Sequence, residues 1–482
     1  MLSDSIEIKN FGPINHSKIE NSNFTILMGN NSSGKSFTAL LMHALINPLG
    51  DKQEDLINEI STLSFDSILK LNNNPDYVNL MDEFTNYSKN QDIENFPFKV
   101  PIDKFENIIN STIGNVYNSL IENRLKLIFG VNNIDDLIRF NCDSFEIKFN
   151  NILIIKKRNE DIIVKNILNL NNFNKKITNE IKLNNNISFK LTKKDNFYHI
   201  NIINNDFDDD NEINISNIFK DFFYQISKTF FQCLTIKHSY YIPSARDELI
   251  KNKNSTLSQN LRNNYILSYM QKELLSNILD NENKPEKGEF YDLACRMEKD
   301  LLDGEIKLKK IESNIEFYYY NEEFNVELPI DLFSSSISET IPLIFYLKYI
   351  LNKDDTLIIE EPEAHLHPLN QRKLVKYFIE AINNDLKLII TTHSDYICDQ
   401  VNNHIRLINI PKNKLKEKFN YTPEDILNSN NVNIYNYVSK SLFNFFTEEI
   451  EINSTGFVEN NFSQVSSDLY DEMNEITDAE EE

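Results

Sequence analysis

The sequence contains no tryptophan, only nine glycines and only four cysteines among 482 residues. The scarce glycine and the abundant asparagine indicate a compositional bias rather than a chemistry. The cysteines lie far apart, and their spacing fits neither a metal site nor a small disulfide framework. They are Cys142, Cys233, Cys295 and Cys398. We therefore expect reduced thiols, as in a cytosolic protein.

Positive charge is also scarce, and the formal net charge is −24. Nucleic acid is bound mainly through Lys and Arg, so this charge disfavours nonspecific binding of DNA or RNA by the surface as a whole. A local basic groove stays open as an alternative.

Long hydrophobic runs are absent from the sequence. The longest apolar stretch, 341–351, is interrupted by Lys348 and is shorter than the roughly 20 residues that a membrane-spanning helix needs. The first residues include Asp4 and Glu7, where a signal peptide would carry positive charge. We therefore expect a cytoplasmic protein, and its length predicts two or three domains.

One stretch organises the chain. Residues 29–36 read GNNSSGKS and fit the phosphate-loop pattern G-x-x-x-x-G-K-[ST] at every required position. The apolar run 24–28 before it predicts a buried strand, and 37–45 after it predicts a helix. An ordinary surface turn rich in Gly, Ser and Asn is the alternative, which the flanking strand and helix disfavour.

The chemistry of this loop assigns roles to its residues. Gly29 and Gly34 permit a backbone that turns its N–H groups toward a phosphate, and the helix N-terminus adds partial positive charge. Lys35 is expected to contact the β- and γ-phosphates of ATP, and the Ser36 hydroxyl is expected to hold Mg²⁺. The nucleotide-binding residues expected here are Gly29, Asn30, Asn31, Ser32, Ser33, Gly34, Lys35, Ser36 and Phe37.

A second set of candidate residues follows two buried strands. The apolar run 357–359 ends in Glu360 and Glu361, and an acid at a strand end beside a phosphate loop suits a second Mg²⁺ contact. One acid would face the metal while the other orients a water molecule. The alternative is that both acids are simply exposed. The next apolar strand ends in His393, which would either donate to a γ-phosphate or help to cap the following helix; the strand order favours the first.

Two further features carry candidate anion contacts. Residues 334–336 are three serines before the predicted helix 340–351, and Ser336 with Glu339 forms a capping-box pattern. A serine-lined helix N-terminus is equally an anion site, so Ser334, Ser335 and Ser336 are candidates for nucleotide binding. Arg246 follows a strand that stops at Pro243, at the strand end where open α/β sheets bind ligands.

Two other patterns are weaker. His365 and His367 lack further ligands at zinc spacing, which disfavours a zinc site. The acidic run 206–212 would suit a two-metal nuclease only if its carboxylates came from separate strands, so a solvated loop is favoured.

Alternation and helical spacing predict the remaining elements. Helices are expected over 53–70, 102–128, 291–302 and 371–382, and strands over 145–149 and 197–202. Residues 304–330 contain three alternating runs that predict an antiparallel meander. The acidic end from Asp468 predicts a terminal helix followed by a frayed tail.

These motifs, in this order, resemble the head of an ABC-type ATPase of the RecF, SMC and OLD-like branch. In detail, GNNSSGKS, YIPSAR, FSSSISE, IIEEPEAHLHP and TTHSD resemble the OLD-like AAA-family ATPases of bacterial anti-phage defence. The resemblance implies an α/β P-loop NTPase with a mixed sheet, an antiparallel β lobe and an inserted α+β domain. The expected division is an ATPase head in 1–49 and 236–450, an insertion domain in 50–235, and an acidic segment in 451–482.

The resemblance also implies catalytic roles. Lys35 and Ser36 correspond to the triphosphate and magnesium contacts, Glu360 to the magnesium-linked acid, Glu361 to the acid that polarises the attacking water, and His393 to the switch histidine. The family's signature corresponds to 334–336, where Ser336 stands in place of the usual glycine. In such relatives the signature reaches the γ-phosphate of a partner, which implies a homodimer, or a higher homo-oligomer, with ATP and Mg²⁺ in its interface.

The expected function is an ATP-binding and ATP-hydrolysing switch that dimerises around ATP and serves as sensor or scaffold for a separate effector in anti-phage defence. A RecF/SMC-like DNA-binding repair ATPase is the alternative, against which stand the net charge and the lack of a heptad repeat in 50–235. A transport ATPase is disfavoured by the large insertion. Because 89 residues follow His393, we expect no additional nuclease domain and no cutting of DNA by the protein itself.

Overall fold

The computed structural model describes most of the chain in two compact units. The described residues are 4–48, 75–90, 98–150, 152–165, 180–182, 187–204, 222, 238–251, 267–282, 285–311, 314–439, 444–458 and 461–481. Unit 1 comprises Met1–Ile46, Leu127–Cys142 and His238–Glu482, and unit 2 comprises Asn47–Lys126 and Asp143–Lys237. The helix expected over 53–70 and the acidic run 206–212 lie outside the described residues.

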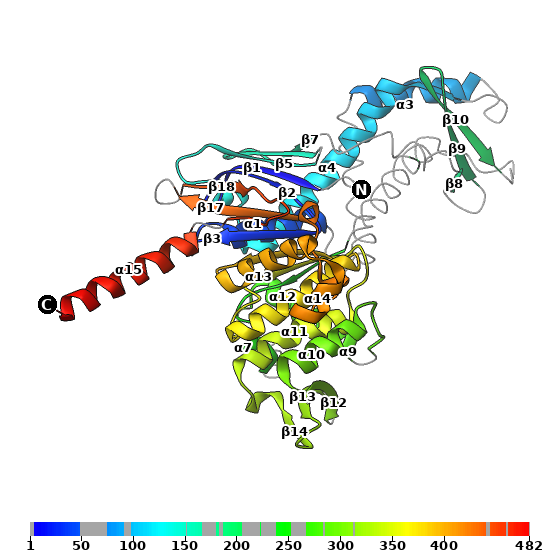
Figure 1. Ribbon diagram of the computed structural model, residues 1–482. Coiled ribbons are helices and arrows are strands. Elements are labelled where there is room, and N and C mark those ends of the chain that lie inside the picture. The colour runs from blue at the N-terminus through cyan, green and yellow to red at the C-terminus, as the bar shows by residue number, and fades with distance from the viewer. Residues whose placement is uncertain are drawn as a thin grey trace. The chain divides into compact units, whose positions relative to one another are not determined.

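Unit 1 contains a mixed sheet, in agreement with the expected fold class (Figure 1). Its strands follow the order β11-β15-β16-β3-β17-β18-β2-β1, of which the first five are parallel to one another. The bounds, in that order, are Ser239–Ile242, Thr356–Glu360, Lys387–Thr392, Phe24–Gly29, Val432–Ser439, Phe445–Ile450, Ile14–Glu20 and Ser5–Phe11. Every residue of β3 and β15 is buried, as the continuous apolar runs of inner parallel strands require.

Helices connect and cover these strands. The helices that precede or follow the sheet strands are α1 (Lys35–Ile46), α7 (Asp247–Lys251), α9 (Tyr269–Glu282), α10 (Tyr291–Leu302), α11 (Ser335–Tyr349), α12 (Pro368–Asn383), α13 (Asp395–Arg406), α14 (Lys412–Phe419) and α15 (Asn461–Glu481). The expected helix over 291–302 is confirmed as α10. None of the described helices has the length and apolar character that crossing a membrane requires.

The expected meander is confirmed as a three-stranded antiparallel sheet of β12 (Glu305–Ile311), β13 (Asn314–Asn321) and β14 (Val326–Pro329). Alternate side chains of β13 pack inward, as the period of a strand dictates. Phe317 lies against Phe345 of α11, and Tyr319 lies 4.5 Å, centroid to centroid, from Phe333. The meander is therefore packed against the start of α11, where the three serines are.

Unit 2 has the α+β character expected of the insertion. Its helices are α3 (Pro75–Asn90) and most of α4 (Ile102–Phe129), its four-stranded sheet has the order β4-β10-β9-β8, and β5, β6 and β7 pair antiparallel. The strand bounds are Phe98–Pro101, Ser144–Phe149, Ile152–Lys157, Ile163–Lys165, Glu180–Lys182, Ile187–Lys194 and Phe197–Asn204 for β4 to β10.

The division into units differs in one place from the boundaries expected from the sequence. Residues 127–142, which the expected boundaries assigned to the insertion, belong to unit 1. Phe129 packs 5.3 Å from the ring of Phe11 and 4.8 Å from that of Phe37. The Gly12 N–H also donates to the Leu137 carbonyl at 2.8 Å. This aromatic packing near the phosphate loop joins distant segments, and a pass along the sequence does not reveal it.

A buried polar network fixes α1 within unit 1. His43 of α1 is fully buried, and its Nε2 lies 2.7 Å from the Glu273 carboxylate of α9. Its Nδ1 lies 3.1 Å from the Ser239 hydroxyl at the start of β11. Because buried polar groups are costly unless hydrogen-bonded, these contacts hold α1 against both elements.

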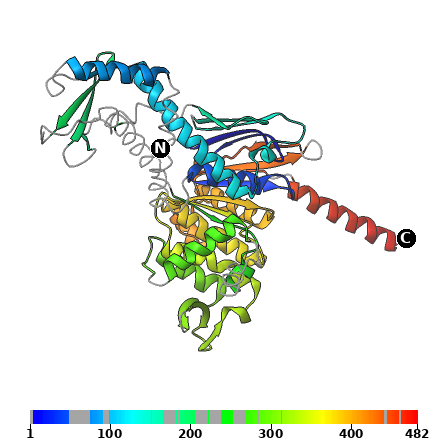
Figure 2. The same ribbon diagram turned by 180° about the vertical axis from the view of Figure 1, so that it is seen from behind.

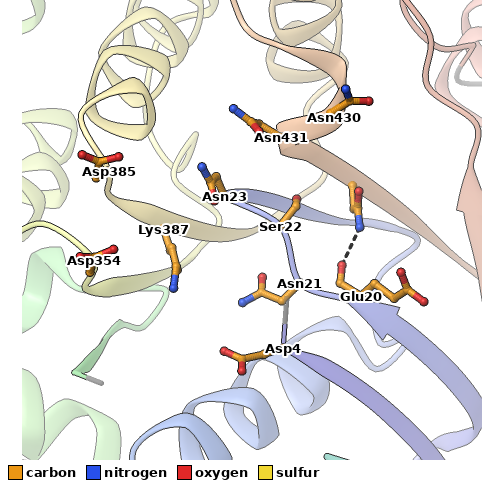
Figure 3. A pocket seen from close by; sticks show the side chains of 11 residues that line it. Asp4, Glu20, Asn21, Ser22, Asn23, Asp354, Asp385, Lys387, Asn430 and Asn431 are labelled. Carbon is orange, nitrogen blue, oxygen red and sulfur yellow. Dashed lines mark hydrogen bonds between the residues drawn. The ribbon is translucent and has the colours of Figure 1, made fainter. Parts of the chain in front are cut away.

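A hollow of about 410 Å³ lies at the edge of the sheet where β3 and β16 begin (Figure 3). The side chains lining it include four carboxylates but a single lysine: Asp4, Glu20, Asp354, Asp385 and Lys387. The Asn433 amide donates to the Glu20 carbonyl on its rim at 2.7 Å. These carboxylates would repel a triphosphate. We therefore expect nucleotide binding at the opposite edge of the sheet, where the parallel strands end.

The buried ion pair between Lys348 and Glu298 gives a first prediction. The two charged atoms lie 2.6 Å apart, and burial raises the pKa of the Glu298 carboxyl above its ordinary value of 4.5. Lys348→Met should leave this carboxylate unpaired and lower the free energy of unfolding by about 3 to 5 kcal/mol at pH 7. Calorimetric or denaturant unfolding measures the loss.

The pH dependence of that loss is part of the prediction. Burial raises the pKa of Glu298 and the Lys348 charge lowers it, so this pKa should be higher in Lys348→Met than in the parent. Protonation then relieves the variant more than the parent, and the loss should shrink as pH falls from 7 toward 4.5. The double variant Lys348→Met, Glu298→Gln is the control and should show no such pH dependence from this pair. A loss in Lys348→Met that stays constant with pH would contradict the interpretation.

Candidate nucleotide-binding site

The phosphate loop connects β3, which ends at Gly29, to α1, which begins at Lys35. Gly29 and Gly34 have φ angles of +135° and +99°, a region that residues with a side chain rarely adopt. A Cβ at Gly29 would also lie 2.8 Å from the Tyr437 carbonyl oxygen. The loop therefore has the backbone that its glycines predicted.

Lys35 points back into its own loop. Its Nζ donates to the carbonyls of Gly29 at 2.9 Å and Asn30 at 2.8 Å, and lies 3.4 Å from the Ser33 hydroxyl. Burial lowers the pKa of Lys35 to about 8, although the nearby Glu361 and Glu363 carboxylates oppose the shift. Two carbonyls and a hydroxyl thus surround the ammonium group, and phosphate oxygens would be chemically equivalent partners.

The strand register brings the two candidate sets to one edge of the sheet. Strands β15, β16 and β3 are consecutive and parallel, with Glu360 opposite Thr391 and Thr392 opposite Met28. The residues that follow these strand ends are therefore neighbours. Lys35 and Glu361, 326 positions apart in the sequence, lie close enough to influence one another electrostatically.

The two adjacent acids have different surroundings. Glu360 is only 8% exposed, and one of its carboxylate oxygens accepts from the Ser244 N–H at 3.1 Å. The Glu361 side chain is 45% exposed, and its backbone has a φ of +44°, which is strained for a residue with a Cβ. The Glu361 N–H donates to the Thr391 carbonyl at 3.0 Å, which holds this strained position in place.

His393 lies beside Glu361. Its Nε2 is 3.8 Å from a Glu361 carboxylate oxygen, and 29% of its side chain is exposed. Burial and the Lys35 charge lower the pKa of His393, partly opposed by Glu361, so the imidazole is neutral at pH 7. The following helix is capped by Ser394, whose hydroxyl accepts from the Ile397 N–H, so the capping alternative for His393 is wrong.

Glu363 is a residue of this edge that the sequence reasoning missed. One of its oxygens accepts from the Thr392 hydroxyl at 2.8 Å and from the His393 N–H at 2.7 Å. Burial raises the pKa of its carboxyl, opposed by these hydrogen bonds. Glu363 therefore holds the end of β16 against the turn that follows β15. The signal available in the sequence is a run of three acids, Glu360, Glu361 and Glu363, around Pro362.

Arg246, a candidate nucleotide contact, is buried and bonded to protein groups. Its Nε donates to the Glu339 carbonyl at 2.9 Å and lies 3.1 Å from a Glu339 carboxylate oxygen. One Nη donates to the carbonyls of Pro243 and Glu360 at 3.0 and 2.9 Å. This geometry favours a positioning role, in which Arg246 joins the ends of β11 and β15 to α11, over direct contact with phosphate.

The signature serines lie at the N-terminus of α11. Ser334 is the N-cap, Ser335 begins the helix, and the hydroxyls of Ser334 and Ser336 lie 2.8 Å apart. The expected capping box of Ser336 with Glu339 is wrong, because the helix begins earlier and the Glu339 side chain is turned to Arg246. The serines remain partly exposed, while α11 is joined to the carboxylate strand through Arg246.

Oxygen donors for Mg²⁺ are present where the motifs predicted them. Ser36 is exposed at the start of α1, and Glu360 has a carboxylate oxygen beyond the one that Ser244 occupies. One carboxylate with one hydroxyl suits Mg²⁺, which keeps waters and phosphate oxygens as its other ligands. His367 instead caps α12, its Nδ1 accepting from the Leu369 N–H at 3.2 Å. Within the described residues, no group of three or more His, Cys, Asp and Glu is arranged to hold a metal.

The lowered pKa of Lys35 predicts proton uptake on nucleotide binding. Bound phosphate favours the charged ammonium, so the pKa of Lys35 should rise above 8 in the complex. Affinity should then be full below pH 8 and fall by up to about tenfold per pH unit above it. Titration calorimetry at pH 8.5 in buffers of different ionisation enthalpy measures the proton uptake. Lys35→Arg, which stays charged, should show no uptake from this position; equal uptake in both proteins would contradict the prediction.

Arg246→Lys tests the positioning role. Lysine keeps the charge but loses most of the hydrogen bonds to buried carbonyls, so the free energy of unfolding should fall by about 2 to 3 kcal/mol. Thermal unfolding measures this, with Arg158→Lys at an exposed position as the matched control. Unchanged stability combined with lost nucleotide affinity would instead make Arg246 a phosphate contact.

Comparisons with known proteins identify the family. Residues 1–398 match the family of the AAA ATPase domain. Endonuclease GajA of Bacillus cereus (strain HuB5-5) is 23% identical over 403 residues, which are 77% of this chain and 52% of GajA. The chain thus spans about half the length of this curated relative.

Two solved structures show weak similarity. The SMC head bound to the C-winged helix domain of ScpA aligns with a TM-score of 0.40 and 11% identity, over 94% of this chain and 98% of that chain. The SMC head domain from Thermotoga maritima aligns with a TM-score of 0.34 and 10% identity, over 94% and 100% of the two chains. These scores carry no weight beside the strand order and the family match.

The family match covers most of the chain and includes the phosphate loop, the carboxylate strand and His393. It confirms the ATPase family that the motifs indicated. The protein belongs to the AAA ATPase domain family.

Proposed function

We propose that this protein binds ATP with Mg²⁺, hydrolyses it, and uses the cycle to switch between a separated and an ATP-bound dimeric state. The observation that carries the proposal is the strand register, which brings Lys35, Glu361 and His393 to one edge of the sheet. A cation to neutralise phosphate charge and a half-exposed carboxylate to position water are groups that phosphoryl transfer to water uses, and a neutral imidazole beside them can donate a hydrogen bond.

Each residue has a defined task in this proposal. Lys35 neutralises the β- and γ-phosphates, and Ser36 and Glu360 would hold Mg²⁺, which supplies charge stabilisation when bound. Glu361 accepts a hydrogen bond from the attacking water and orients it. His393 is neutral at pH 7, so its Nε2 can donate to a γ-phosphate oxygen if the Nδ1 is unprotonated.

The position of the signature serines supports the proposed dimer. Ser334, Ser335 and Ser336 lie at a partly exposed helix N-terminus, a ready site for an anion supplied by another molecule. We place them against the γ-phosphate held by a second copy, so that two ATP molecules lie in the interface. Through Arg246, α11 would then be sensitive to the state of the Glu360 strand.

The biological role we propose is that of a cytoplasmic sensor or scaffold in anti-phage defence, acting through a separate effector protein. Support comes from the motif resemblance and from the similarity to GajA, whose name describes an endonuclease. Because the chain spans about half of GajA, nuclease activity is not transferred, and its absence stays a prediction. A DNA-binding repair ATPase is the second candidate, which salt-dependent retention on duplex DNA would favour.

Glu361→Gln is the variant that tests the switch. The amide should still bind ATP but orient water poorly, so turnover should fall by about 100-fold or more and an ATP-bound dimer should accumulate. Light scattering coupled to size exclusion, with and without Mg·ATP, measures the ATP-dependent gain in molar mass. Lys35→Ala is the matched control and should bind no nucleotide and show no gain. A Glu361→Gln protein whose molar mass is unchanged by ATP would remove the dimer from the proposal.

A further inference from the structure

The last described helix, α15, has no other described element of unit 1 alongside it (Figures 1 and 2). Every residue from 467 to 477 is exposed. The last residues described before α15 are held by Asn402 of α13, whose amide donates to the Phe457 carbonyl at 2.9 Å and whose carbonyl oxygen accepts from the Phe457 N–H at 3.0 Å. The side chains of 467–477 in α15 are not buried by any described part of the chain.

The exposed face of α15 is amphipathic. Leu469, Met473 and Ile476 follow the i, i+4, i+7 spacing of one helix face, Tyr470 adjoins them, and each is more than half exposed. Residues 461–482 contain eight acidic residues and no basic one. An apolar stripe with acidic residues on the other side of the same helix suits a partner surface that offers both apolar side chains and positive charge.

A surface of opposite character occurs in the same unit. Between residues 406 and 420 there are five basic residues and one acid, in a chain whose net charge is −24. The five basic side chains are exposed, and none forms an ion pair with a described residue: Arg406, Lys412, Lys414, Lys416 and Lys418. Ile408 and Phe419 are half exposed beside them. We call this surface, 406–420, the α14 patch.

We infer that α15 of one copy docks on the α14 patch of a second copy, and that the exchange is reciprocal. The acidic side chains of α15 meet the cations of the α14 patch, and its apolar stripe covers Ile408 and Phe419. In the chain itself both surfaces are exposed, so each is open to a second molecule. Reciprocal exchange closes a two-fold dimer, which leaves neither surface unpaired.

This contact is separate from the dimer proposed around ATP. Neither α15 nor the α14 patch contributes a residue to the candidate nucleotide site. The association should therefore occur without nucleotide, and it should weaken as salt increases because exposed charges are screened.

Two charge-reversal variants test the inference. Variant A carries Asp471→Lys, Glu472→Lys and Glu475→Lys in α15, and variant B carries Lys414→Glu, Lys416→Glu and Lys418→Glu in the α14 patch. All six positions are exposed, so we expect the substitutions to leave the fold unchanged. Sedimentation in EDTA, without nucleotide and in a Lys35→Ala background, measures self-association of the full chain.

If α15 docks on a second copy, variant A and variant B should each self-associate at least about tenfold more weakly than the parent protein. An equimolar mixture should recover the parental affinity, because the basic α15 of A meets the acidic patch of B and the acidic α15 of B meets the basic patch of A. Lys148→Glu, Lys310→Glu and Lys353→Glu together are the matched control and should not alter association, since these exposed lysines lie elsewhere.

Three outcomes overturn the inference. If α15 docked on the α14 patch of its own chain, the mixture of A and B would not recover the parental affinity. In that case only a chain carrying both sets of substitutions would restore the contact. The parent would be monomeric across the concentration range if a different protein occupied α15. Loss of duplex DNA retention in B, with self-association unchanged, would assign the α14 patch to nucleic acid. The ATP-dependent gain expected of Glu361→Gln is measured in a protein that also carries variant A, because a dimer already joined through α15 would close around ATP without a gain in molar mass.

Discussion

The parallel hydrogen-bond ladder that joins β15, β16 and β3 is the constraint on which the candidate site depends. Backbone pairing fixes the register of all three strands, and a slip of one residue would turn every buried side chain to the other face. In β3 and β15 every residue is buried, so such a slip would disrupt the close packing on both faces of the sheet. The positions of Glu360, Glu361 and His393 relative to the phosphate loop follow from this register.

Buried polar side chains further fix the positions of the strand ends that the backbone pairing brings together. Arg246 binds backbone carbonyls at the ends of two strands, and Glu363 binds the Thr392 hydroxyl and the His393 N–H. Both side chains are buried in low-dielectric surroundings, where loss of a hydrogen-bonding partner strongly destabilises the folded state. They specify one arrangement of the strand ends, including the strained backbone at Glu361.

The sequence predicted the parts of this site that local rules govern. The phosphate loop, the two acids at the end of β15 and the histidine after β16 follow from motif and strand pattern. The meander follows from alternation, whereas the mixed sheet was expected only from the family resemblance. Glu363 and the bonding of Arg246 were not predictable in this way, because each depends on partners from other strands. The capping box failed for the same reason: Glu339 satisfies the local rule, but a buried arginine 93 positions away competes for its carboxylate.

The contacts of His43 have a mechanical consequence for the molecule. His43 is fully buried, with the Glu273 carboxylate at one ring nitrogen and the Ser239 hydroxyl at the other. Separating α1 from α9 or β11 would leave these buried polar groups without hydrogen bonds, which is unfavourable. The first helix, α9 and the outermost parallel strand therefore form one stiff body. A movement of α1 that begins at the phosphate loop should therefore move α9 and β11 with it. Movement of α1 alone would break the hydrogen bonds of His43.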